Sequence, residues 1–341
     1  MSIMLAETHE APARVAAMLE ADQAIYDAFA AALADRPPPF VATIARGSSD
    51  HAATYLANLL GIAAGLVTAS FPPSLVTRYG VRPKLDGALV LGISQSGAGP
   101  DILAAMRAAG ASGATTAAIV NAEGSPLAAG AAHLLRPHAG VERSVAATKS
   151  FICTLAVAAR LVAIWLGDKD MGDALRQLPQ RLETALACDW SAAVPLLREA
   201  TSLYVVGRGP GLGIAQESAL KLKETSMLHA EALSAAEVRH GPRAVIGAGF
   251  PMLAYALADP GGDDTRAFAL ELAATGAHVA IASHAPVPSP ALHLPLPAPL
   301  HPLLDPIVAI QAFYPLAAAL SAARGFDPDR PPGLAKVTRT V

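Results

Sequence analysis

Short apolar runs alternate along this chain with longer segments in which apolar residues recur at helical spacing. The short runs are typical of buried strands, and the longer segments predict amphipathic helices. The predicted strands are residues 40–45, 89–93, 117–120, 202–206, 252–257 and 278–282. The predicted helices are residues 51–61, 101–109, 150–166, 212–227, 264–274 and 303–324. Strands that alternate with helices predict an α/β fold, in which helices flank parallel sheets.

The same pattern occurs twice, once in each half of the chain. Arg46 with Gly47, and Arg208 with Gly209, each follow an apolar strand and precede a helix. The loops after the second strand of each half, and the third strands themselves, keep this offset to within one residue. Chance alignment of apolar strands is the alternative, but it leaves unexplained why three separate elements keep one offset. We therefore expect a duplicated α/β domain.

A hydroxyl-rich loop follows the second strand of the first half. Ser94, Gln95, Ser96 and Gly97 stand between this strand and the next predicted helix. In open α/β sheets ligands bind where strands end, and the N–H groups at a helix N-terminus favour an anion. The loop therefore predicts a phosphate site, with an ordinary helix cap and turn as the alternative.

Two comparisons within the sequence sharpen this prediction. The matching loop of the second half carries Ala258, Asp259 and Pro260. A carboxylate repels phosphate, so only the first copy is predicted to bind it. The glycine-rich run 207–213 lacks the GxGxxG pattern in every register, and the chain has no Walker A pattern. A dinucleotide-binding dehydrogenase is therefore disfavoured.

Candidate acid–base residues gather in the second half and near the C-terminus. Lys221 and Glu224 are three positions apart on a predicted helix and therefore share a face. Glu224 could be a general base, His240 an acid–base group, and Lys336 a partner of a phosphosugar or of its carbonyl. Solvated ion pairs and a turn-capping histidine are the alternative, because spacing alone does not make these residues catalytic.

Composition narrows the class of protein. Of the 341 residues 53% are hydrophobic and 16% are charged, which excludes a disordered chain. The net charge of −3, without a basic run, disfavours nucleic acid as a partner. The most apolar stretch, 151–166, contains Arg160 and is shorter than the ~20 residues that a membrane span needs. Cys153 and Cys188 are too few for a disulfide framework or a cysteine zinc site. Because the first residues also lack a signal-peptide pattern, we expect a cytoplasmic protein.

Six short motifs then occur in an order that points to a family. They are Ala45-Arg46-Gly47-Ser48-Ser49, Ile93-Ser94-Gln95-Ser96-Gly97, Val145-Ala146-Ala147-Thr148-Lys149, Leu220-Lys221-Leu222-Lys223-Glu224, Glu237-Val238-Arg239-His240-Gly241-Pro242 and Leu334-Ala335-Lys336. Over nearly its whole length the chain resembles the sugar isomerase (SIS) enzymes, in particular the isomerase half of glutamine–fructose-6-phosphate aminotransferase. It looks closer still to the stand-alone glucosamine-6-phosphate deaminases, which are built from the same two SIS domains.

This resemblance implies two tandem SIS domains, each a parallel sheet flanked by helices in a flavodoxin-like three-layer sandwich. The expected parts are an N-terminal helical segment (1–30), a phosphosugar-binding SIS domain (31–167), a helical connector (168–195), a second SIS domain (196–328) and a tail over the active site (329–341). The resemblance also implies a homodimer, in which His240 reaches the active site of the neighbouring subunit.

The resemblance assigns roles to individual residues as well. Those expected to hold phosphate or sugar oxygens are Gly47, Ser48, Ser49, Ser94, Gln95, Ser96, Val145 (through its backbone) and Ala335. Glu224 is expected to move a proton between C1 and C2, His240 to open the sugar ring, and Lys221 to assist near the reacting carbons. Lys336 is expected to lie over the active site. No metal or redox cofactor is expected, because an adjacent imine or carbonyl already acidifies the C–H bond.

The chain departs from the aminotransferase pattern in two places. Ala98 and Gly99 stand where an acid and a threonine usually follow the SQSG motif, and Ala147 stands where a serine usually precedes Thr148. Both changes look like the deaminase branch, and they leave the identity of the sugar open. The aminotransferase's glutaminase domain begins with a catalytic cysteine, whereas the first cysteine here is Cys153. We therefore expect no glutamine hydrolysis by that route.

Together these features predict an enzyme that converts glucosamine 6-phosphate to fructose 6-phosphate and ammonia. Glu224 would take the proton from C2 and return it to C1, and water would hydrolyse the resulting ketose imine. Two alternatives remain open: an aminotransferase-like isomerase without the glutaminase domain, and a non-catalytic phosphosugar-binding regulator. The regulator is disfavoured because the chain keeps Glu224, His240 and Lys336 and has no DNA-binding extension or basic patch.

Overall fold

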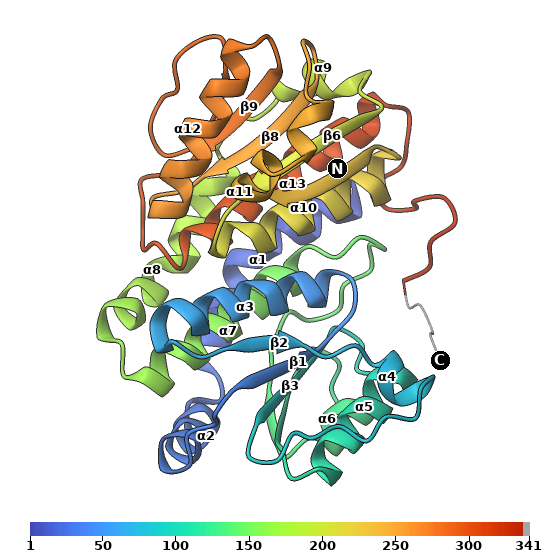
Figure 1. The fold of residues 1–341 in the computed structure, drawn as a ribbon, viewed down its shortest axis with the longest axis vertical. Coiled ribbons are helices and arrows are strands. Elements are labelled where there is room, and N and C mark those ends of the chain that lie inside the picture. The colour runs from blue at the N-terminus through green and yellow to red at the C-terminus, as the bar shows by residue number, and fades with distance from the viewer. Residues whose placement is uncertain (337–341) are drawn as a thin grey trace. The chain divides into compact units, whose positions relative to one another are not determined.

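The computed structural model describes residues 1–336, so residues 337–341 of the expected C-terminal tail lie outside the described residues. The chain forms two compact units, each built round one sheet (Figure 1). The first-sheet unit comprises Ala13–Val141, Cys153–Arg176 and, within the described part, residues 335–336. The second-sheet unit comprises Met1–Pro12, Glu142–Ile152 and Gln177–Leu334. The helices that contribute residues to both units are α1 (Ile3–Glu20), α7 (Lys149–Leu166) and α8 (Lys169–Leu186).

The first-sheet unit contains a parallel sheet with the strand order β2-β1-β3-β4-β5. Its strands are β1 (Val41–Ile44), β2 (Thr68–Ser70), β3 (Leu89–Ser94), β4 (Thr115–Val120) and β5 (His133–Leu135). Its helices include α2 (Gln23–Asp35), α3 (Ser48–Ala64), α4 (Ser74–Thr77), α5 (Pro100–Ala111) and α6 (Pro126–Gly130). Strands β1 and β3 are buried along almost their whole length, which requires a cover on both faces. Helix α5 packs on the face that carries Ala42, Ile44 and Val90, and α3 lies against the other face (Figure 1).

The second-sheet unit contains a parallel sheet with the strand order β10-β9-β8-β6-β7. Its strands are β6 (Ser202–Gly207), β7 (His229–Ser234), β8 (Pro251–Ala256), β9 (His278–Ser283) and β10 (Leu292–Pro295). Its helices include α9 (Ala193–Arg198), α10 (Pro210–Ser226), α11 (Ala235–Arg239), the 3₁₀ turn η1 (Pro242–Val245), α12 (Pro260–Ala274) and α13 (Asp305–Ala323). Phe268 and Leu272 of α12 pack against Val206, Ala254 and Ile281 of the sheet. Helix α10 packs against β6, β7 and α13.

Matching turns indicate that the two units share one plan. In each unit a glycine shortly after the first strand, Gly47 after β1 and Gly209 after β6, caps the next helix, and the two glycines have almost the same backbone angles. Gly47 has φ 55° and ψ −134°, and Gly209 has φ 55° and ψ −132°. Positive φ is a conformation that glycine adopts without strain. The predicted α/β fold with two parallel, helix-flanked sheets is confirmed.

Within residues 1–336, two helices are long and apolar enough to cross a membrane. They are α7 and α13, and 78% of the apolar window of each is buried inside the molecule. Core helices of globular proteins pass the same test of length and composition, so this finding is weak evidence for a span. Within α7 the buried guanidinium of Arg160 donates hydrogen bonds to the carbonyl oxygens of Met18 and Ala21.

Candidate active site

The turn after β1 contains three of the residues predicted to bind phosphate. Gly47 is the N-cap of α3, and Ser48 and Ser49 form the first turn of this 17-residue helix. Both serine side chains are half-buried. The first N–H groups of a helix have no partner within the helix, so they attract an anion together with nearby hydroxyls. The N–H groups of Ser49 and Asp50 already donate to the carbonyl oxygens of Arg46 and Gly47, at 3.2 Å and 2.9 Å. What the turn offers an anion is therefore the two hydroxyls and the positive dipole end of α3.

The end of β3 and the loop after it contain three more, Ser94, Gln95 and Ser96. The Ser94 Oγ accepts a hydrogen bond from the Gly97 N–H at 3.0 Å, and the Ser96 Oγ accepts one from the Ala98 N–H at 3.4 Å. These bonds form tight turns in the loop just before α5. Ser94, Gln95 and Ser96 are half-buried, so their remaining polar atoms are within reach of a ligand.

Two N–H groups in the segment after β4 donate hydrogen bonds to the backbone of this loop. The Ala122 N–H donates to the Gln95 carbonyl oxygen and the Leu127 N–H to the Gly97 carbonyl oxygen, each at 3.1 Å. Gly97 has a φ of 61°, and a Cβ placed on it would lie 2.2 Å from the Ser125 Oγ. Only glycine fits this position, because any side chain would displace Ser125, which caps α6.

An ion pair joins the two hydroxyl-bearing turns. Strands β1 and β3 are hydrogen-bonded neighbours, so their carboxyl ends lie side by side. Arg46 follows β1, and its Nε and Nη2 atoms each lie 3.1 Å from the Oδ2 of Asp101, in the first turn of α5. The Asp101 side chain is 3% exposed and that of Arg46 is 50% exposed. A charge-assisted contact of this kind fixes the spacing of the two turns before a ligand arrives.

The matching end of the second sheet has a different chemistry. Asp259 is the N-cap of α12, and its Oδ1 accepts a hydrogen bond from the Gly262 N–H at 2.7 Å. The ion pair is repeated there, between Arg208 and Asp264. A phosphate at this helix would meet the carboxylate of Asp259, which already binds the helix N-terminus. This geometry supports the prediction that only the first copy binds an anion.

Helix α10 presents three charged residues on one face. The Lys221 Nζ lies 3.4 Å from the Oε1 of Glu217 and in closer contact with the Oε2 of Glu224. The side chains of Glu217 and Lys221 are 0% and 1% exposed, whereas that of Glu224 is 21% exposed. Spacings of three and four residues bring these side chains together. Of the two carboxylates, Glu224 is therefore the one that a ligand can reach.

The charge state of Lys221 follows from its neighbours. Burial alone would lower the pKa of the ammonium group, but the carboxylates of Glu217 and Glu224 outweigh burial, and the pKa is raised. Lys221 therefore stays protonated at neutral pH and acts as a fixed cation. A protonated amine is not a nucleophile, so this lysine is unsuited to imine formation. Its position fits the predicted assisting role near Glu224.

Two buried tyrosines belong to the same unit. The Tyr255 hydroxyl lies 2.6 Å from the Ser218 Oγ. The Tyr314 hydroxyl is buried and has no hydrogen-bond partner within the described part of the chain. Burial raises the pKa of both phenols, and the carboxylates of Glu217 and Glu142 add to this effect at Tyr314. Both hydroxyls therefore stay protonated and can take part in hydrogen bonds but not serve as bases.

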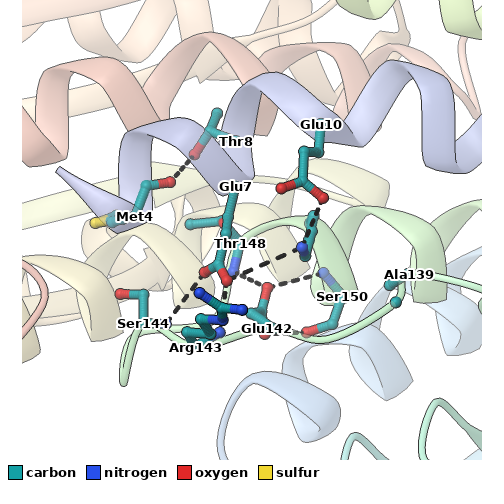
Figure 2. A network of polar contacts seen from close by, with 12 residues as sticks. Met4, Glu7, Thr8, Glu10, Ala139, Glu142, Arg143, Ser144, Thr148 and Ser150 are labelled. Atoms are coloured by element: carbon teal, nitrogen blue, oxygen red, sulfur yellow. Dashed lines mark hydrogen bonds and ion pairs between the residues drawn. The ribbon is translucent and has the colours of Figure 1, made fainter. Parts of the chain in front are cut away.

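The other predicted residues are distributed over both units. His240 is the C-cap of α11 in the second-sheet unit, and its side chain is exposed. Ala335 and Lys336 belong to the first-sheet unit, where Ala335 is exposed and Lys336, the last described residue, is half-buried. Val145 lies in a segment without regular structure that leads into α7. Glu7 and Glu142 hold this segment through its backbone (Figure 2).

Four acidic or phenolic residues near these positions were not predicted from the sequence: Glu7, Glu142, Glu217 and Tyr314. Of these, Glu217 had a usable signal, because it lies one helical turn before Lys221. In the region 1–336, no group of three or more His, Cys, Asp or Glu side chains is arranged to hold a metal ion. The expectation that no metal is needed stays a prediction.

The family model for the SIS domain matches residues 40–164 and 196–288. Over 98% of its length the chain is 34% identical to glutamine–fructose-6-phosphate aminotransferase [isomerizing] from Methanothermobacter thermautotrophicus, of which it covers 56%. The chain thus spans about half the length of the curated relatives it matches.

Solved structures agree with this match. A protein from Silicibacter pomeroyi DSS-3, provisionally assigned as a phosphosugar isomerase, has a TM-score of 0.91 and 40% identity, over 96% of this chain and 100% of that chain. The C-terminal domain of glucosamine–fructose-6-phosphate aminotransferase from Francisella tularensis has a TM-score of 0.88 and 25% identity, over 97% of this chain and 98% of that chain.

The expected closeness to the deaminases is not supported. A glucosamine-6-phosphate deaminase from Thermotoga maritima has a TM-score of 0.78 over 99% of this chain and 100% of that chain, but only 21% identity. That level of identity shows a shared fold and nothing more. The aminotransferase relative is more similar in sequence, so the comparisons favour the aminotransferase-like alternative over the deaminase.

Proposed function

Because the chain belongs to the SIS domain family, we propose that it is an aldose–ketose isomerase that acts on an amino sugar 6-phosphate. The sequence relatives, named as isomerising aminotransferases, supply the class of substrate. The observation that carries the proposal is the pair Lys221 and Glu224 on α10, in which a reachable carboxylate is held beside a buried ammonium group. This pairing suits a general base that moves a proton between neighbouring carbons.

In this proposal the first-sheet unit binds the 6-phosphate group. Hydroxyl groups of Ser48, Ser49, Ser94 and Ser96 donate to its oxygens, together with the amide of Gln95. The starts of α3 and α5 add the favourable dipole ends of two helices. The ion pair between Arg46 and Asp101 supports the proposal because it holds both turns in place without a ligand.

The proton transfer is assigned to Glu224. With the ring opened by His240, which passes a proton between the C1 hydroxyl and the ring oxygen, C2 lies next to a C1 imine or carbonyl. The Glu224 carboxylate takes the C2 proton, the C–H electron pair forms a C1–C2 double bond, and the former C1 π pair moves to the C1 heteroatom, which takes up a proton. The same carboxyl group then returns its proton to C1 while the C2 heteroatom loses one, which leaves the double bond between C2 and that heteroatom. Lys221 holds Glu224 by charge, and Lys336 is proposed to bind the sugar.

Two outcomes can follow this shared step. In an aminotransferase-like isomerase the step runs in reverse: ammonia and fructose 6-phosphate form the C2 imine with loss of water, the proton moves from C1 to C2, and the product is the amino sugar phosphate. In a deaminase, water attacks the C2 imine and releases ammonia and fructose 6-phosphate. Ala98, Gly99 and Ala147 favour this second candidate, because they depart from the aminotransferase pattern. The comparisons favour the first, so we place it ahead.

One experiment tests the common step and separates the outcomes. The protein is incubated in D₂O with glucosamine 6-phosphate, or with fructose 6-phosphate and ammonium, without glutamine. An isomerase incorporates deuterium at C1 or C2, which NMR detects. Ammonia release from glucosamine 6-phosphate identifies the deaminase. A protein that binds both sugars but exchanges no hydrogen would be a phosphosugar-binding regulator, and the isomerase proposal would be wrong.

The Glu224→Gln variant tests the base directly. Glutamine keeps the size of glutamate and one acceptor oxygen, but its amide cannot accept a proton from carbon. We expect deuterium exchange to fall by about 10²–10⁴-fold, as for loss of a general base, with substrate affinity changed little. Lys223→Gln, one position away on the same helix, is the matched control and should retain exchange. Near-normal exchange in Glu224→Gln would remove Glu224 from this role.

The assembly is also a proposal. The exposed position of His240 at the end of α11 is compatible with its serving the active site of a second subunit in a homodimer. A cytoplasmic location, as expected from the composition, stays a prediction.

A further inference from the structure

The buried carboxylate of Glu142 binds the backbone at the far end of the segment that contains Val145. The Glu142 side chain is 5% exposed, and its Oε1 accepts hydrogen bonds from the Thr148 N–H at 2.9 Å and the Ser150 N–H at 3.0 Å. Its Oε2 accepts a third bond, from the Ser150 Oγ at 2.6 Å. These N–H groups belong to the start of α7, where helical N–H groups have no partner within the helix. Glu142 therefore caps α7 from upstream and ties both ends of the segment together.

A second carboxylate holds the same segment from helix α1. The Glu7 side chain is 4% exposed, and its two oxygens accept hydrogen bonds from the N–H groups of Arg143 and Ser144, at 2.5 Å and 3.2 Å. Glu10, one turn further along α1, pairs with the Lys149 ammonium group at 2.8 Å. Figure 2 shows Glu7 and Glu10 projecting from α1 toward this segment. The backbone on either side of Val145 is thus fixed.

The backbone in the middle of the segment, at residues 145–147, is not held in this way. Val145, Ala146 and Ala147 form no hydrogen bond to any partner among residues 1–336. Their backbone N–H and C=O groups are strong donors and acceptors, and Ala146 is fully buried. A backbone that is fixed at both ends and has unused polar groups between them is suited to bind the hydroxyl groups of a ligand.

We propose that Glu142 and Glu7 are positioning residues for the sugar, which hold the backbone of residues 143–148 in the conformation that contacts it. This inference rests on the proposed function, in which the Val145 backbone binds the sugar. Carboxylates suit the task because they only accept hydrogen bonds, and the groups to be fixed here are N–H donors. Neither residue touches the reacting carbons in this proposal, so both act through the segment.

The test compares sugar binding with phosphate binding. Titration calorimetry measures the affinity of the full chain for fructose 6-phosphate and for inorganic phosphate. In Glu142→Ala we expect the affinity for fructose 6-phosphate to fall about tenfold or more, because a displaced backbone loses its contacts. The affinity for inorganic phosphate should stay within about twofold, because the phosphate ligands lie in other turns. KM should rise while kcat changes less.

Ser150→Ala is the matched control, because it removes the hydroxyl bond to the Glu142 Oε2 and leaves both backbone bonds to the Oε1. It should bind both ligands as the natural chain does. Glu142→Gln keeps one acceptor oxygen for the two N–H groups and should shift sugar affinity in the same direction by a smaller factor. This variant carries the test if thermal unfolding shows that Glu142→Ala is not folded.

The possible contrary results are distinct. A folded Glu142→Ala variant with unchanged sugar affinity, or with equal losses for both ligands, contradicts a positioning role. A purely structural role would lower the amount of active protein, and hence the apparent kcat, without raising KM. Failure of the proposed function would appear elsewhere, as absence of deuterium exchange in the natural chain.

Discussion

Gly97 allows the shape of the hydroxyl-rich loop because it has no side chain. Its φ of 61° is unfavourable for residues with a side chain, and the Ser125 hydroxyl occupies the space that a Cβ would need. Ser125 also caps α6 by accepting a hydrogen bond from the Ala128 N–H. The shape of the loop and the start of α6 therefore depend on the same missing methyl group.

The Gly97→Ala variant should destabilise both the hydroxyl-rich loop and the start of α6. We expect a loss of about 1–3 kcal/mol in the free energy of unfolding, because the variant adds backbone strain and forces Ser125 to move. Affinity for inorganic phosphate should fall as well. Urea unfolding and calorimetry measure the two effects. Gly130→Ala, at the end of α6 where a Cβ meets nothing within 4 Å, is the control and should be close to neutral. Unchanged phosphate affinity in Gly97→Ala would mean that this loop does not bind the anion.

Single residues differ in how far the sequence could predict them. Ser94, Gln95, Ser96 and Glu224 follow from a strand end and a helical face, which are local patterns. Glu7 could not be found in this way, because its partners Arg143 and Ser144 lie more than a hundred positions away and are reached through backbone N–H groups that carry no sequence signal.

At the level of elements, the six central strands were predicted and the four edge strands, β2, β5, β7 and β10, were not. Strands β1, β3, β6 and β8 are buried on both faces and therefore read as continuous apolar runs. Strand β7 reads His-Ala-Glu-Ala-Leu-Ser, and its alanine and glutamate residues favour a helix. Hydrogen bonding along all of β6 overrides that preference. Local propensity alone could not have revealed this pairing.

The contribution to stability of Glu7, which links α1 to the segment before α7, should depend on pH. Burial raises the pKa of Glu7 above its ordinary value of 4.5, although the N–H groups of Arg143 and Ser144 and the charge of Lys149 oppose this, while Glu142 adds to it. The folded chain thus binds this proton more tightly than the unfolded chain. The contribution of Glu7 to stability is therefore largest at low pH and declines as the pH rises from about 4.5 through the raised pKa.

Glu7→Gln removes this titration. Relative to the variant, the natural chain should lose stability as the pH rises from about 4.5 toward neutrality, which urea unfolding at several pH values measures. Glu183→Gln, an exposed position on α8, controls for the general effect of removing one negative charge. A difference between the natural chain and Glu7→Gln that does not vary with pH would show that burial does not perturb Glu7.

For the whole molecule, duplication was visible in the sequence, but the division of the chain was harder to foresee. The second-sheet unit takes in Met1–Pro12 and Glu142–Ile152, both far from its sheet in sequence. These stretches are tied to each other by Glu7 and Glu10, through long-range contacts that no hydrophobic pattern records. Sequence reasoning that places boundaries in linkers has no means of detecting such an exchange.

Mixed subunits test the proposed homodimer. If His240 serves the neighbouring subunit, Glu224→Gln and His240→Ala are each inactive alone, but a mixed dimer holds one active site with both natural residues. After unfolding and refolding an equal mixture, we expect about a quarter of natural activity, since half the dimers are mixed and each has one active site of two. Activity no higher than that of the separate variants would place His240 and Glu224 of one subunit together, or exclude a role for one of them.

Asp259 makes the two halves impossible to interchange. Ile62 holds the place in α3 that Glu224 holds in α10. Under the proposed function, a polypeptide assembled from two first halves would therefore bind two anions and have no carboxylate to move a proton. One assembled from two second halves would carry two such carboxylates, with Asp259 repelling the charged end of the substrate at each copy. Under the proposed function, each half therefore supplies a group that the other lacks.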